Sequence, residues 1–224
     1  MTHALAHPVP ATTPPIRDRM LRLIVVGAGG RGSAYAAYAA STGRAEIVAV
    51  AEPDPRRAAE ARDRHPDAVS FDDWQSLAED PPAADAVIIA TQDAHHVEPA
   101  VHFAELGYHI LLEKPMATSE RGTRLITDAV RRAGVMLAVC HVLRYTPYTS
   151  AVKRIVDSGR LGDVVSVEHL EPVGWWHQAT RTSAATGAAR TSPVPCCSPS
   201  PRTTWTGSPS SSASPYGRSP PSAA

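Results

Sequence analysis

The chain has 224 residues, enough for one large domain or two small ones, and 22 basic against 22 acidic residues leave it formally uncharged. The balance is uneven, because every Asp and Glu precedes residue 179 while four arginines follow it. These arginines are scattered and lack interleaved aromatic residues, so the composition gives no support for a nucleic-acid partner. No apolar run reaches the length of a membrane-spanning helix, so we expect no membrane partner.

The chain opens with MTHALAHPVPATTPPIRDR, in which prolines interrupt any apolar stretch. A signal peptide needs such a stretch, so we expect residues 1–20 to be a disordered leader, with Met20 as an alternative start. The three cysteines, at positions 140, 196 and 197, have neither metal-ligand spacing nor a disulfide framework. These features predict a cytoplasmic protein without a metal site.

From residue 21 onward, short apolar runs alternate with helical periods. The runs read as strands are LRLIVVG, AEIVAVAE, DAVIIAT, YHILLEKP and VMLAVCH, and the helices between them include one over 119–133. Gly107 and Gly134 follow predicted helices, where C-terminal caps are expected. Continuous β-branched runs separated by helices predict an α/β fold with a doubly wound parallel sheet over residues 21–142.

The pattern changes after Arg144. The segment PYTSAVKRIVDSGRLG reads as a helix closed by a glycine turn, and DVVSVEHLEPVGWW as an edge or antiparallel strand. We expect residues 143–178 to begin a second, incomplete α/β domain. Residues 179–224 are mostly Ser, Pro, Ala and Thr and cannot bury enough apolar surface, so we predict a disordered tail.

A glycine-rich motif, GAGGRG, follows the first predicted strand and opens a helix. Gly27 permits a tight turn, Gly29 lets the backbone approach a pyrophosphate, and Gly32 allows the helix to pack close to the strand. This context predicts a Rossmann dinucleotide-binding domain. The cofactor-binding residues expected in the motif are Gly27, Ala28, Gly29, Gly30, Arg31 and Gly32.

Glu52 lies twenty residues beyond Gly32, at the end of the second predicted strand. A carboxylate there accepts hydrogen bonds from ribose hydroxyls and repels a 2′-phosphate, which favours NAD. Arg56 and Arg57 are close enough in sequence to soften this preference, so NADP is the alternative cofactor. The competing interpretation is a glycine turn of another α/β protein with a solvated Glu52.

Glu113, Lys114 and Pro115 follow a predicted strand, at the edge where open α/β sheets bind ligands. A lysine there can act as an acid or base or hold a substrate oxygen, and the proline can form a cis peptide. The chain has only two lysines, Lys114 and Lys153, among its 22 basic residues. This scarcity argues against the alternative that Lys114 is an ordinary surface side chain.

GAGGRG, Glu52, ATQDAHH, EKP and RYTPYTSAVKRIVDSGRLGDVVSVEH together resemble the Gfo/Idh/MocA family of NAD(P)-dependent oxidoreductases, over roughly residues 21–179. The resemblance implies a Rossmann domain followed by an α/β domain whose open sheet binds substrate and often mediates oligomers. It implies hydride transfer at a carbinol carbon of a sugar or cyclitol, with Lys114 as the catalytic residue at the reacting oxygen.

The resemblance also extends the implied cofactor site. The family's segment after the fourth strand maps onto Thr91, Gln92 and His96, with Gln92 in place of the usual proline. A helix-terminal hydrogen bond is an equal alternative for His96. The remaining members of the implied cofactor-binding set are Glu113, Lys114 and Arg144, and the alternative for Arg144 is packing at the domain hinge.

The tail departs from the family pattern after GWWHQA. A one-base shift of the reading frame over residues 180–207 permits HSYVRGNWR and MLLAKSSHDLDW, segments that resemble the family's continuation. We therefore expect a frameshift near residue 179, and a chain that binds NAD(H) weakly without turnover and lacks most of the usual oligomer interface. The alternative is a non-catalytic dinucleotide-binding regulator whose Pro/Ser-rich tail recruits a partner.

Overall fold

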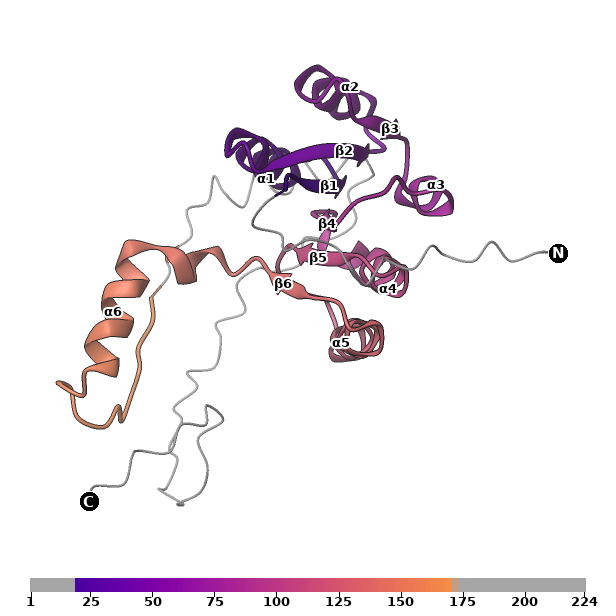
Figure 1. Cartoon of the computed structure of the whole chain (residues 1–224). Coiled ribbons are helices and arrows are strands. Elements are labelled where there is room, and N and C mark those ends of the chain that lie inside the picture. The colour runs from indigo at the N-terminus through magenta and orange to yellow at the C-terminus, as the bar shows by residue number, and fades with distance from the viewer. Residues whose placement is uncertain (1–18, 171, 173–224) are drawn as a thin grey trace. The chain divides into compact units, whose positions relative to one another are not determined.

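The structure is a computed structural model that describes residues 19–170 and 172 (Figure 1). The chain divides into two compact units between Thr146 and Pro147. The strands of the first unit are β1 (Leu21–Val26), β2 (Ala45–Ala51), β3 (Val69–Phe71), β4 (Ala86–Ile89), β5 (His109–Leu112) and β6 (Leu137–Val139). Its helices are α1 (Gly30–Ser41), α2 (Pro55–Arg64), α3 (Trp74–Glu79), α4 (Val97–Glu105) and α5 (Glu120–Ala133), with 3-10 turns η2 (Asp93–His95) and η3 (Val142–Tyr145).

The six strands form one parallel sheet in the order β3-β2-β1-β4-β5-β6. The strand order reverses between β1 and β4, and open sheets of this kind bind ligands in the crevice above the carboxyl ends of those two strands. β1 ends at Val26, directly before the glycine-rich motif, and β4 ends at Ile89, just before Thr91. The predicted doubly wound sheet is confirmed.

Alternate residues of the central strand β1 face opposite sides of the sheet, as the two-residue strand period requires. Leu23 and Val25 pack with the small residues Ala36 of α1 and Ala61 of α2. The other face carries the larger core, to which α3, α4 and α5 contribute Leu77, Phe103 and Ile126. Figure 1 shows α1 and α2 on one side of the sheet and α3 to α5 on the other. Both faces of the sheet are therefore covered, as expected for continuous apolar strands.

The helix ends use the caps that the sequence indicates. Asp54 accepts from the backbone N–H groups of Arg56 and Arg57 at the start of α2. Ser119 caps α5 through the N–H of Gly122. Gly107 and Gly134 follow α4 and α5 with positive φ, as predicted.

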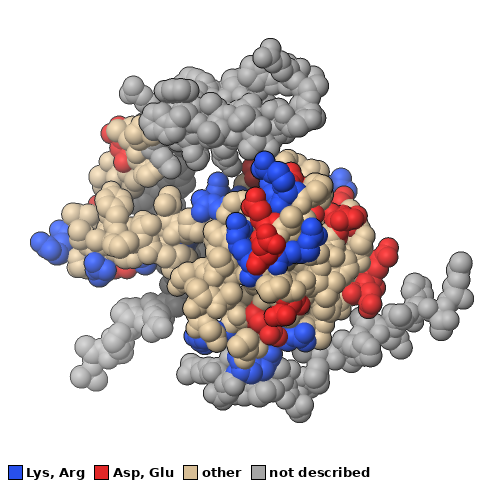
Figure 2. All heavy atoms as spheres, turned by 90° about the horizontal axis from the view of Figure 1, so that it is seen from above, with Lys and Arg blue, Asp and Glu red and all other residues tan. Residues whose placement is uncertain are grey.

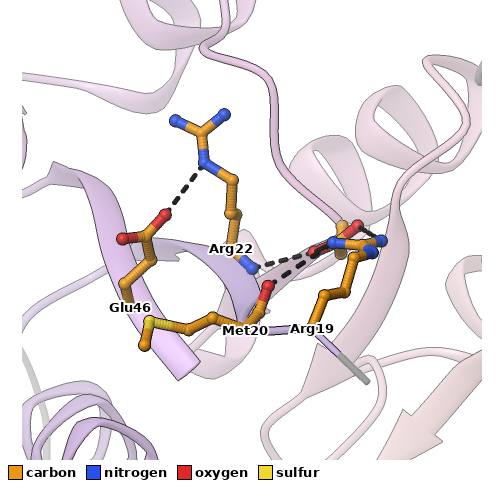
Figure 3. A network of polar contacts seen from close by, with 5 residues as sticks. Arg19, Met20, Arg22 and Glu46 are labelled. Atoms are coloured by element: carbon orange, nitrogen blue, oxygen red, sulfur yellow. Dashed lines mark hydrogen bonds and ion pairs between the residues drawn. The ribbon is translucent and has the colours of Figure 1, made fainter. Parts of the chain in front are cut away.

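Charged side chains pair with one another at the amino-terminal edge of the sheet (Figure 3). Asp85, directly before β4, accepts from the Arg19 guanidinium and, at 2.8 Å, from the backbone N–H of Arg22. The Arg22 guanidinium lies 3.1 Å from the Glu46 carboxylate on β2. The hydrogen bond from Arg19 holds the pKa of Asp85 below its usual value. These contacts tie together the starts of β1, β2 and β4.

The described part of the second unit contains helix α6 (Pro147–Asp157), which matches the predicted helix and is followed by glycine turns. Residues 163–170 form neither helix nor strand, so the strand predicted over DVVSVEHLEPVGWW is not formed in them. A strand is stable only beside a partner strand, and none of the described strands pairs with this segment. The rest of that prediction, residues 1–18 of the leader predicted over 1–20, and the tail over 179–224 lie outside the described residues. Arg19, at the end of the predicted leader, is described and pairs with Asp85. None of the described helices is long and apolar enough to cross a bilayer.

Candidate functional site

The glycine-rich motif forms a tight connection between β1 and α1. Gly27 has a φ of +88°, and a Cβ at this position would lie 2.8 Å from the carbonyl oxygen of Ala90. At Gly32, in the first turn of α1, a Cβ would lie 1.9 Å from the carbonyl oxygen of Gly27. The predicted roles of these two glycines, a tight turn and close helix packing, are confirmed.

The start of α1 leaves room for an anion. Gly29 is the N-cap and offers no side chain to the first N–H groups of the helix, and a Cβ built there would meet only the Arg57 guanidinium, at 3.9 Å. Helix N-termini with open backbone N–H groups favour negative charge. The residues present therefore fit a pyrophosphate at Gly29 and Gly30.

A hollow of about 460 Å³ opens beside this helix start, between α1 and α2. Arg56, Arg57 and Arg64 line it, together with Glu60, which pairs with Arg64 at 3.5 Å. Within residues 19–170, no carboxylate forms an ion pair with Arg56 or Arg57. Two guanidinium groups thus remain available to a phosphate beside the glycine-rich motif.

Glu52, the predicted ribose acceptor, is 5% exposed at the end of β2. Its Oε2 accepts from the backbone N–H of Ala28 at 2.7 Å, and its Oε1 accepts from the N–H of Asp54 at 3.0 Å. The carboxylate therefore joins the glycine-rich motif to the turn before α2. Each carboxylate oxygen has a second lone pair, so capacity to accept from a ribose hydroxyl remains.

Glu113 is buried at the carboxyl end of β5. Its Oε1 accepts from the Tyr35 hydroxyl at 2.6 Å and lies 3.6 Å from Nε of Arg31, and its Oε2 accepts from the backbone N–H of Lys114 at 2.7 Å. The peptide between Lys114 and Pro115 is cis. The Lys114 side chain is exposed and forms no ion pair with a described carboxylate. The turn is thus fixed through its backbone, while the ammonium has no carboxylate partner among the described residues.

Tyr35 is a site residue that sequence reasoning missed. Burial, and then its hydrogen bond to Glu113, raise the pKa of the Tyr35 hydroxyl above its usual value, so the hydroxyl is a neutral donor. Burial likewise raises the pKa of the neighbouring Cys140 thiol. The bond from Tyr35 to Glu113 spans 78 positions of the chain. The local pattern SAYAAYAAS does not predict that Tyr35 contacts a residue so distant in the sequence.

The segment after β4 places its predicted residues around a buried histidine. His96 is fully buried, with Nδ1 2.7 Å from the carbonyl oxygen of Pro115 and Nε2 3.2 Å from that of Thr91. The Thr91 hydroxyl donates to the carbonyl of His95 at 3.1 Å, and the carbonyl of Gln92 accepts from the N–H of His95 at 2.7 Å. The His96 side chain does not cap α4, so the predicted helix-terminal bond is not formed.

Arg144 lies on η3, after β6, where its backbone N–H donates to the carbonyl of His141 at 3.0 Å. Its side chain is exposed, and within residues 19–170 it makes no ion pair with Glu52 or Glu113.

No group of three His, Cys, Asp or Glu side chains that could hold a metal occurs among the described residues. On the face in Figure 2, basic side chains lie beside acidic ones rather than in one continuous patch.

Comparisons with known proteins agree with this geometry. The model of an oxidoreductase family with an NAD-binding Rossmann fold matches residues 21–141, more than half of the chain. Levoglucosan dehydrogenase from Pseudarthrobacter phenanthrenivorans is 35% identical over 117 residues, which are 52% of this chain and 30% of that protein. The scyllo-inositol 2-dehydrogenase (NAD(+)) of Bacillus subtilis is 31% identical over 147 residues, 65% of this chain and 42% of that protein.

A solved dehydrogenase structure is also similar to this chain. The WlbA dehydrogenase from Bordetella pertussis, in complex with NADH and UDP-GlcNAcA, matches with a TM-score of 0.61 and 30% identity, covering 64% of this chain and 44% of that one. The chain thus spans less than half the length of each of these three relatives. On the family match over residues 21–141, the chain belongs to the Gfo/Idh/MocA family of oxidoreductases with an NAD-binding Rossmann fold.

Proposed function

We propose that this chain binds NAD(H) above the carboxyl ends of β1 and β4, with NADP as the alternative cofactor. The open backbone at Gly29 and Gly30 receives the pyrophosphate, and Glu52 accepts from the adenosine ribose in addition to its two backbone bonds. The WlbA dehydrogenase relative contains NADH, and the Bacillus subtilis relative is named for NAD(+). Both support a nicotinamide dinucleotide as the ligand.

One observation carries the proposal: the Tyr35 hydroxyl donates to Glu113 at 2.6 Å. Tyr35 lies on the helix that the glycine-rich motif opens, and Glu113 precedes Lys114. The bond joins the helix that GAGGRG opens to the EKP segment, and both motifs are among those that carry the family resemblance. It supports placing Lys114 beside the cofactor rather than on an unrelated part of the surface.

The nicotinamide ring, when bound, donates or accepts a hydride. The chain's own contribution is the Lys114 side chain. As an ammonium it donates a hydrogen bond to a substrate carbonyl oxygen and gives up a proton when C=O becomes C–OH, and as a neutral amine it accepts the hydroxyl proton when C–OH becomes C=O. The names of the relatives support a sugar or cyclitol as the substrate class. Residues that select this substrate are proposed to lie beyond residue 170, so we expect cofactor binding to be retained by the 224-residue chain more fully than turnover.

Calorimetric titration of the full chain with NADH tests the proposal. We expect saturable binding, together with binding of ADP-ribose, which carries the pyrophosphate and both riboses but no nicotinamide. Gly29→Asp places a carboxylate at the expected pyrophosphate position and should abolish both. Lys114→Met is expected to keep ADP-ribose binding, since the lysine serves the nicotinamide end. A chain that binds neither ligand at millimolar concentration would contradict the proposed function.

A further inference from the structure

His96 is the most deeply buried polar side chain of the described residues, with 0% exposure. Its backbone carbonyl accepts from the N–H of Ala100 in α4, but its side chain forms no hydrogen bond with the first N–H groups of that helix. Both ring nitrogens face backbone carbonyl oxygens instead, 2.7 Å away at Pro115 and 3.2 Å away at Thr91. A carbonyl oxygen only accepts, so the shorter distance favours Nδ1–H as the donor to the Pro115 carbonyl. The side chain therefore connects the loops that follow β4 and β5.

The carbonyl that His96 holds belongs to the residue directly after Lys114. Pro115 has no backbone N–H, so this carbonyl is its only hydrogen-bonding group. On the other side, the N–H of Lys114 donates to Glu113 at 2.7 Å. The backbone on both sides of Lys114 is thus held by buried side chains, although the lysine side chain itself is exposed. Because no described carboxylate pairs with the ammonium, its direction follows from this backbone.

We propose that His96 is a positioning residue for Lys114, acting through the hydrogen bond from Nδ1 to the Pro115 carbonyl. The proposal rests on the proposed function, because it gives Lys114 a ligand to reach. Loss of the donor removes the hydrogen bond that ties the Pro115 carbonyl to the buried His96 ring, so the turn is no longer held at this point. A displacement of about 1 Å is enough to spoil a contact that depends on orientation.

Because the chain has only two lysines, the accessibility of Lys114 can be measured directly. Lys114 and Lys153 are the only lysines, and Lys153 lies on α6, paired with Asp157 at 2.7 Å. A brief pulse of acetic anhydride on the full chain, followed by peptide mass spectrometry, gives the ratio of acetylated Lys114 to acetylated Lys153. Lys153 acts as the internal standard for reagent and time. The pulse is applied without ligand and with saturating NAD⁺.

We expect NAD⁺ to lower this ratio about fivefold in the unaltered chain, the change that about 1 kcal/mol of contact produces. His96→Phe fills the same space without a donor and should reduce the protection to less than about twofold. His96→Asn places an amide N–H near the position of Nδ1 and should restore the protection. The ADP-ribose dissociation constant should stay within about twofold in all three proteins, because that ligand stops short of Lys114.

Each other result has a defined meaning. Protection of Lys114 in His96→Phe equal to that in the unaltered chain overturns the inference. Binding of NAD⁺ without protection of Lys114 in the unaltered chain overturns it too, since no ligand then lies near the lysine. Failure of the unaltered chain to bind NAD⁺ and ADP-ribose refutes the proposed function instead. If His96→Phe loses ADP-ribose binding, His96→Asn and His96→Gln decide: protection in Asn alone supports the role of Nδ1, and protection in Gln alone contradicts it.

Discussion

The two edges of the parallel sheet use charged residues in opposite ways. At the amino-terminal edge, Arg19, Arg22, Glu46 and Asp85 pair with one another (Figure 3). At the carboxyl edge, the buried side chains Glu52, His96 and Glu113 bond mainly to backbone groups of the loops. Three cations of that edge, Lys114, Arg56 and Arg57, have no carboxylate partner among the described residues, whereas Arg31 lies 3.6 Å from Glu113.

This difference separates a structural edge from a ligand-binding one. Paired charges satisfy each other and hold strand ends together, whereas buried acceptors aimed at loop N–H groups fix the backbone and leave exposed cations for a ligand. The comparison makes a simple prediction. Changes at the amino-terminal edge should affect unfolding and spare ligand binding, while changes at the carboxyl edge should affect ligand binding in proportion to how far they move the loops.

The largest effect is expected at Gly32. Gly32→Val places a Cβ where only 1.9 Å separates it from the carbonyl oxygen of Gly27, so α1 must move away from β1. We expect a loss of about 3 kcal/mol in the free energy of unfolding and no measurable NADH binding. Gly30→Ala is the control for unfolding, because a Cβ there meets nothing within 4 Å and should stabilise slightly. Urea unfolding measures the free energy of unfolding, and titration measures NADH binding. A Gly32→Val protein that unfolds and binds NADH like the unaltered chain would contradict the close packing of α1 against the glycine-rich motif.

The next effect is expected at the opposite edge. Asp85→Ala removes the acceptor of the Arg22 N–H and of the Arg19 guanidinium, and should cost about 2 kcal/mol of unfolding free energy without changing NADH affinity. Glu46→Ala removes a half-exposed partner of Arg22 and should cost less than about 0.5 kcal/mol. An Asp85→Ala protein with weakened NADH binding would show that the two edges are not independent.

The same carboxylate gives a pH dependence. Because the folded pKa of Asp85 is lowered, its contribution to stability is complete above the unfolded pKa and is lost as the pH falls through the folded value. The difference in unfolding free energy between the unaltered chain and Asp85→Ala should stay constant from pH 7 to about 5 and shrink below about 4. Urea unfolding across this range is the measurement. A difference that grows on acidification would have the wrong sign.

A smaller effect is expected at Tyr35. Tyr35→Phe removes the hydroxyl that donates to Glu113 and leaves the buried carboxylate with the Lys114 N–H and Arg31. We expect a loss of about 1 kcal/mol of unfolding free energy and a several-fold weaker NADH affinity. Tyr38→Phe, on the exposed face of the same helix, is the matched control and should change neither. Equal behaviour of the two variants would remove the observation on which the proposed function rests.

The sequence predicted those parts of the site that depend on local backbone geometry. Gly27 and Gly32 could be assigned to a turn and a close contact because their spacing along the chain sets both. Glu52 was correctly placed at the end of a strand. Its bonds to Ala28 and Asp54 could not be foreseen, because they depend on how the turn before α2 folds back over the glycine-rich motif.

The sequence could not predict the contacts that cross the sheet. Tyr35 meets Glu113, and His96 meets Pro115, only after β1, β4 and β5 have paired in register. For His96, the helix cap that the sequence offered is not formed, the cofactor contact stays a prediction, and the bond to the Pro115 carbonyl was not foreseen. The strand expected after residue 163 also depends on partners elsewhere in the chain. Contacts between side chains that meet only when distant strands pair leave no pattern in the nearby sequence.

The smallest effect concerns cofactor choice at the hollow between α1 and α2. Arg57→Gln removes a guanidinium without a carboxylate partner among the described residues, so the affinity for NADP should fall by up to about fivefold while the affinity for NAD changes less. Arg62→Gln, exposed on the same helix but outside the hollow, is the matched control. Calorimetric titration of both variants with both cofactors gives the ratio of affinities. A ratio unchanged by Arg57→Gln would mean that the 2′-phosphate does not reach this cation, and that Glu52 alone sets the preference on the ligand-binding edge.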